Sequence, residues 1–116
     1  MASGATVSAY VVAPLCRGAE RELALHGEEA GGLHVRAICL PRTERGGRLD
    51  LAQIGANARR AAQDSAAIGY IGEPTRAASR FSETILEAAR IRQFAAIPGA
   101  AAMRALLREL EDGRLG

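Results

Sequence analysis

The sequence alternates strand-like and helix-like segments four times, and this alternation restricts the fold more than any other feature of the chain. Short runs rich in β-branched and apolar residues predict strands, and apolar residues at helical spacing predict helices. Connections that contain a helix join parallel strands through right-handed crossovers. We therefore expect one α/β domain over residues 1–116, with a doubly wound, mainly parallel four-stranded sheet and helices on both faces. The expected strands are 6–13, 34–40, 67–71 and 92–97, and the expected helices are 17–30, 50–63, 75–90 and 100–111.

Capping residues and helix breakers indicate where the helices begin and end. Asp50 suits an N-cap, and Pro74 suits the first turn of the third helix, where its missing N–H needs no acceptor. Gly31 and Gly32 indicate the end of the first helix. The stretch 41–48, PRTERGGR, is the one clear loop, and we expect it to be the most mobile segment.

Composition excludes several classes of protein. Aromatic residues make up only 3% of the chain, and the net charge is +2, so neither base stacking nor phosphate binding is indicated and we expect no nucleic-acid partner. No run of about 18 apolar residues occurs, which predicts no membrane insertion. The first residues, MASGATVSAYVVAPL, lack the basic region of a secretory signal, so an export signal would lie outside this chain.

The loops that follow the strands are the expected place for a ligand, because doubly wound sheets bind ligands beyond the carboxyl ends of their strands. These loops are 14–17, 41–48, 72–75 and 97–99. In the third loop, the hydroxyls of Thr75 or Ser79 and the free amides of a helix start could hold a carboxylate, or Thr75 could simply cap the helix. Glu73 could meet a ligand ammonium or only complement the helix N-terminus.

Arginines in the second of these loops are a further candidate for anion binding. Arg42, Arg45 and Arg48 surround a Gly-Gly pair, and they either hold an anion or are solvated. The loop lacks the Lys-Ser/Thr of a P-loop, and no G-x-G-x-x-G occurs in the chain, so we expect no nucleotide cofactor.

The two cysteines leave three alternatives. Cys16 lies close to a helix N-terminus, which can lower a thiol pKa, so it could be an active thiol. It could equally be a packed side chain, or it could form a disulfide with Cys39, since adjacent strands can bring the two together. The hypothesis of an enzyme rests on Cys16 alone, and we expect a protein without enzymatic activity. The two His and two Cys lie on separate elements without ligand spacing, so no metal site is predicted.

Residues 57–79, NARRAAQDSAAIGYIGEPTRAAS, resemble the N-terminal lobe of type 1 periplasmic binding proteins, in particular the branched-chain amino acid receptors of ABC transporters. Members of that family carry a stretch like NARRAAQDP-IAYIGEFNSGAS. The resemblance covers most of residues 6–100 and is most specific over 49–79. It extends through AYVVAPL and EEAGGLHVRAICL on one side and through ETILEAARIRQFA on the other.

The resemblance implies a binding module that captures an amino-acid-like ligand without covalent chemistry. In the family, two lobes close over the ligand, and the N-lobe's strand ends hold its carboxylate and ammonium. Carried over, Ala78 and Ser79 would hold the polar head, and the loop with Cys16 would face the cleft. The residues that would border the cleft are Glu73, Pro74 and Thr75. The resemblance implies uptake by an ABC transporter and a periplasmic or extracellular location. A cytoplasmic location is the alternative, because no signal peptide is recognised in this chain.

This chain also departs from the family pattern. Arg76 replaces the first serine of the loop, Thr84 replaces a helix proline and Arg90 replaces a glycine. The resemblance covers one lobe only. For these residues alone we expect an exposed sheet edge or apolar face, and with it a homodimer or a partner chain that completes the sheet. The leucine-rich face of the last helix could dock that partner or pack on its own sheet. The alternative function is a structural or regulatory interaction domain that keeps the fold without binding a ligand.

Overall fold

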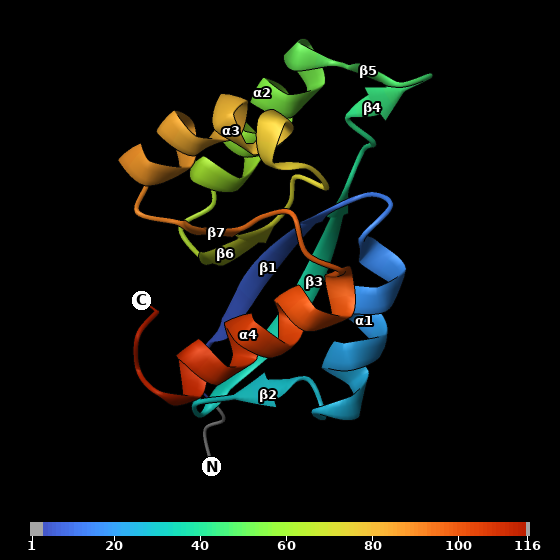
Figure 1. The fold of residues 1–116 in the computed structure, drawn as a ribbon. Coiled ribbons are helices and arrows are strands. Elements are labelled where there is room, and N and C mark those ends of the chain that lie inside the picture. Colours follow the sequence, from blue (N-terminus) through green and yellow to red (C-terminus); the bar gives the residue numbers. More distant parts are fainter. Residues whose placement is uncertain (1–3, 116) are drawn as a thin grey trace.

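A five-stranded sheet separates two pairs of helices in the computed structural model, which describes residues 4–115 (Figure 1). The sheet order is β2-β3-β1-β6-β7. Its strands are β1 (Thr6–Val12), β2 (Glu29–Ala30), β3 (Leu33–Leu40), β6 (Ala67–Ile71) and β7 (Arg92–Phe94). The helices are α1 (Cys16–Leu25), α2 (Leu51–Ala62), α3 (Arg76–Ala88) and α4 (Gly99–Glu111), and a separate hairpin is formed by β4 (Glu44–Arg45) and β5 (Arg48–Leu49).

The mixed α/β class is confirmed, and the four expected strands are parallel neighbours. β1 pairs with β3 from Thr6–His34 to Val12–Leu40, and it pairs with β6 on its other side. β6 in turn pairs with β7. α1 and α4 cover one face of the sheet, and α2 and α3 cover the other. The order reverses between β1 and β6, so the loops after these two strands diverge and leave a crevice at the carboxyl edge.

The expected number of four strands is wrong, because β2 adds an antiparallel edge strand beside β3, so the sheet has five strands and is mixed. The expected first helix, 17–30, ends early at Leu25. Gly27 and Glu28 adopt left-handed conformations with φ of 68° and 59°, which turn the chain back toward the sheet. Gly31 and Gly32, expected to stop a helix, instead form the turn between β2 and β3.

The segment 41–48 is also more regular than expected, because it contains most of the β4–β5 hairpin. Gly46 and Gly47 have φ of 56° and 79°, and two consecutive positive φ values are typical of a two-residue hairpin turn. The fourth strand ends at Phe94 and not at residue 97. Ala96 has a φ of 62°, and its N–H donates to the carbonyl of Glu73 at 2.9 Å, which bends the chain away from the strand direction.

Helix starts follow the sequence closely. Asp50 is the N-cap of α2, as predicted, and its carboxylate accepts a hydrogen bond from the Gln53 N–H at 3.0 Å. Thr75 is the N-cap of α3, so Pro74 lies just before the helix and not inside its first turn. The leucine-rich face of α4 is buried against the sheet and α1, so of the two alternatives for this face, packing within the chain is observed. Its buried residues include Met103, Leu106, Leu107 and Leu110.

Candidate functional site

A cleft of about 260 Å³ lies at the carboxyl edge of the sheet, at the crevice where the strand order reverses. The loop after β1 contributes Ala13 and Pro14, and the loop after β6 contributes Pro74. The segment after β3 forms the rest of the wall with Arg42, Thr43, Glu44 and the two hairpin glycines. Three consecutive parallel strands therefore supply the lining, which is the arrangement that doubly wound folds use for ligands.

Glu73 lies beneath this cleft and supports its wall. Its side chain is fully buried, and Thr43 Oγ1 donates a hydrogen bond of 2.5 Å to its Oε1. The Tyr70 hydroxyl donates to Oε2 over a longer 3.4 Å. Burial raises the pKa of Glu73, and the two hydrogen bonds only partly oppose this rise. Burial, together with the neighbouring carboxylate of Glu73, raises the pKa of Tyr70 as well. The carboxyl group of Glu73 thus points into the protein and holds Thr43 in place.

The N-cap and the middle of α2 hold the segment that forms the outer wall. The Asp50 N–H donates to the Thr43 carbonyl at 2.7 Å, and Asn57 Nδ2 donates to the Pro41 carbonyl at 2.9 Å. Arg45 also pairs with the Asp50 carboxylate at 3.6 Å. These contacts position the segment after β3 on both sides of Arg42 and Thr43, so the wall of the cleft is preformed.

The wall formed by the segment after β3 carries side chains of both charges. Arg42 and Glu44 are exposed and line the cleft, whereas Arg45 is paired and Arg48 does not line it. Pro74, on the opposite wall, precedes the N-terminus of α3. There the Thr75 hydroxyl accepts a hydrogen bond from the Ala78 N–H at 3.2 Å. The N–H groups of Arg76 and Ala77, which come before it in the helix, have no acceptor within the helix. The cleft can therefore offer a cation and amide donors to a carboxylate and an anion to an ammonium.

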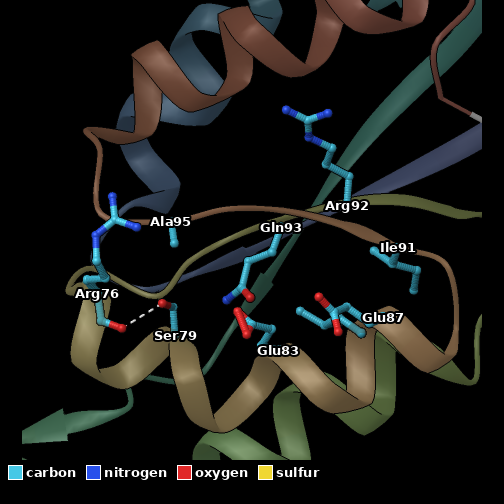
Figure 2. Close-up of a pocket in the computed structure, with 9 residues that line it drawn as sticks. Arg76, Ser79, Glu83, Glu87, Ile91, Arg92, Gln93 and Ala95 are labelled. Atoms are coloured by element: carbon cyan, nitrogen blue, oxygen red, sulfur yellow. Dashed lines mark hydrogen bonds between the residues drawn. The ribbon is translucent and has the colours of Figure 1, made fainter.

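The structure separates the residues that the sequence singled out. Glu73 and Thr75 flank Pro74 at the cleft, but Glu73 faces inward and Thr75 caps α3. Ala78 is buried on the inner side of α3. Ser79 donates to the Arg76 carbonyl at 2.7 Å and lines a different pocket, of about 420 Å³, between α3 and β7 (Figure 2). The role of these residues in holding a ligand stays a prediction.

Cys16 forms a disulfide with Cys39, across a Cα–Cα distance of 5.9 Å. Of the three alternatives for Cys16, this is the one observed, and it leaves no free thiol to act as a nucleophile. Potential ligand atoms of Cys16, Glu20 and Cys39 lie within 4.8 Å of one another, although the sequence suggested no such group. Because the two sulfurs are bonded to each other, they are not thiolate ligands in this form.

Sequence reasoning did not single out Thr43 or Glu44, and it grouped Arg42 with two arginines that do not line the cleft. A usable signal was present: Arg42, Thr43 and Glu44 follow directly after a predicted parallel strand, at the edge where ligands bind. No family model, no curated protein and no solved structure matches this chain. Among residues 4–115, no helix is long and apolar enough to cross a membrane.

Proposed function

We propose that this protein is a binding module for a small zwitterionic molecule such as an aliphatic amino acid. The observation that carries the proposal is the cleft at the switch point, with Arg42 and Glu44 on one wall and the N-terminus of α3 beside the other. Arg42 and the first amides of α3 would hold the carboxylate, and Glu44 would hold the ammonium. Thr75 would border the head group. Capture is non-covalent and requires no cofactor.

The size of the cleft supports a small ligand. Its volume of about 260 Å³ lies just below the roughly 300–1,000 Å³ of pockets that enclose drug-sized molecules. An amino acid suits this space better than a nucleotide does. The wall is held by a buried network, so little reorganisation would oppose binding.

The resemblance to branched-chain amino acid receptors supports the same ligand class, and with it a role in ABC-transporter uptake. The Cys16–Cys39 disulfide supports an oxidising compartment, such as the periplasm or the cell exterior, because disulfides persist there and are rare in the cytosol.

A thermal-shift titration against the twenty amino acids and small carboxylates tests the proposal. A ligand at a hundred times its dissociation constant should add about 2.7 kcal/mol to the free energy of unfolding. Arg42→Gln should abolish the shift because it removes the proposed partner of the carboxylate. Arg48→Gln is the matched control, since Arg48 belongs to the same hairpin and is exposed but does not line the cleft.

A third variant locates the ligand independently. Ser79→Ala alters the α3–β7 pocket and leaves the cleft unchanged. A shift that survives Arg42→Gln but is lost in Ser79→Ala would place the ligand beside β7 and contradict the proposed site. The absence of a shift with every compound would favour the alternative function, an interaction domain without a ligand, for which the open edge of β7 is the specific observation.

A further inference from the structure

A groove runs along the outer edge of the sheet, between the last strand and α3 (Figure 2). β7 is the terminal strand, and among residues 4–115 no segment pairs with its free side. Ile91, Gln93 and Ala95 line one wall of the groove. The other wall is the side of α3 that faces β7, with buried Ser79 and Leu86 at its base and exposed charged residues above them. The groove is therefore an unpaired strand edge with a helix beside it.

The backbone of Gln93 faces this open side. The carbonyl of Phe94 points toward β6, because it accepts a hydrogen bond from the Gly72 N–H at 3.1 Å. Successive residues of a strand direct their N–H and C=O groups to opposite sides, so those of Gln93 point outward. The side chain of Gln93 is hydrogen-bonded within the chain: Nε2 donates to Ser82 Oγ at 2.7 Å and to the Gly72 carbonyl at 2.9 Å. Gln93 thus offers one backbone donor and one backbone acceptor to another strand.

The exposed flank of α3 carries a segregated stripe of charge. Arg76 and Arg80 occupy the N-terminal half, and Glu83 and Glu87 occupy the C-terminal half, all four exposed. Like charges four residues apart, as in each half of the stripe, destabilise a helix, and the polarity of the stripe opposes the helix dipole. Arg80 and Glu83 have a favourable spacing of three residues but form no ion pair. None of the four forms an ion pair with another of the described residues.

We propose that the partner of this edge is a second copy of the same chain, paired antiparallel through β7 about a two-fold axis at Gln93. The rotation brings each Gln93 opposite its symmetry mate, in a pair that exchanges both backbone hydrogen bonds. The same rotation runs the two α3 helices antiparallel. Arg76 then faces Glu87 of the second copy, and Arg80 faces its Glu83. The charge pattern that is unfavourable in one chain becomes self-complementary in the pair.

The spacing of such a dimer agrees with ordinary packing. A helix that links two neighbouring strands lies over both of them, and strands are separated by about 4.8 Å. The two α3 helices would then lie about 10 Å apart, at the upper end of normal helix–helix distances. The two five-stranded sheets would become one continuous sheet with no free β7 edge.

Sedimentation of the native chain and two charge variants tests this inference. Glu83→Arg with Glu87→Arg gives a uniformly basic stripe, and Arg76→Glu with Arg80→Glu gives a uniformly acidic one. Each variant alone should sediment as a monomer, because its stripe would face a like-charged copy. An equimolar mixture should restore the dimer as a heterodimer. Glu111→Arg, an exposed substitution on α4, is the control that should leave the native dimer intact.

Both charge patterns agree better with the dipole of α3 than the native one does, which opposes the added repulsion between positions 80 and 83, so both variants are expected to fold. Circular dichroism checks this directly. The amide of Gln93 gives a second readout: its hydrogen exchange in the native chain should slow as protein concentration rises. A native chain that stays monomeric at every soluble concentration would overturn the inference, and so would a dimer that persists in both charge variants. Ligand binding at the cleft is independent of all these outcomes.

Discussion

The two faces of the sheet are built from different kinds of contact. On the α1/α4 face, the core is a continuous apolar cluster in which Leu106 and Leu107 of α4 pack on the central strands. To this face α1 adds one buried charged residue, Glu22, which is hydrogen-bonded to Arg104. On the α2/α3 face, more of the buried side chains are polar. They are Asn57 of α2, Ser79 and Ser82 of α3, Thr43 in the cleft wall and Glu73 beneath it. The cleft's hairpin wall and the β7 groove both depend on this second face. We infer that the first face supplies most of the stability and that the second positions the recognition surfaces.

Truncation of Leu106 is expected to have the largest effect. Its side chain is fully buried in the apolar cluster, so Leu106→Ala should lower the free energy of unfolding by about 2–5 kcal/mol through lost burial and a residual cavity. Chemical denaturation measures this value. Leu25→Ala is the control, because Leu25 is 76% exposed and its loss should change little. A cost for Leu106→Ala no larger than that of the control would refute the division between the two faces.

The disulfide reinforces the same face by tying the start of α1 to the end of β3. It closes a loop with a sequence separation of 23, and replacement of both cysteines by serine should lower the free energy of unfolding by about 2–4 kcal/mol. A reductant should lower the melting temperature of the native protein and leave that of the double variant unchanged. An equal response of both proteins, or of neither, would contradict this contribution.

A smaller change in the free energy of unfolding is expected from pH, and its sign differs between the two faces. Burial raises the pKa of Glu73, so the folded state holds its proton more tightly than the unfolded state does. Its contribution to stability is therefore present below the unfolded value of 4.5 and is lost as pH rises through the folded pKa. Relative to Glu73→Gln, which mimics the protonated group, the native protein should lose stability with rising pH.

Glu22, on α1, supplies the opposite case. The hydrogen bond from Arg104 holds the pKa of Glu22 below 4.5, so its contribution is present above that value and is lost as pH falls through the folded pKa. Unfolding of Glu22→Gln and Glu73→Gln across pH 3–8, each compared with the native protein, measures both slopes. Slopes of the same sign would show that the two carboxyl groups do not differ in environment as described.

The sequence predicts the parallel part of the fold well and its edges poorly. β6 begins and ends where the apolar run does, and the Asp50 cap is found as expected, because both signals are local. β2 and the β4–β5 hairpin are missed because two-residue strands have almost no periodicity and depend on pairing with distant residues. The inward turn of Glu73 is missed for a similar reason: its partner Thr43 lies 30 residues away in sequence.

The sequence predicted where the candidate site lies but not which residues line it. Strand order places it at the carboxyl edge of β1, β3 and β6, and the sequence identifies those loops. Which side chains line it depends on the hairpin, whose contacts with α2 decide that Arg42 lines the cleft while Arg45 turns to Asp50. Ser79, predicted from the resemblance, faces the β7 groove instead.

The most direct test of the proposed ligand site is an NMR titration of the ¹⁵N-labelled protein with aliphatic amino acids. Saturable shifts are expected for the backbone amides of Thr43, Glu44 and the hairpin glycines, and for those of Thr75 and Arg76 at the start of α3. Amides at the far end of α4 should not move. Shifts confined to Gln93 and Ala95 beside β7, or no shift with any of these compounds, would contradict ligand binding at the cleft.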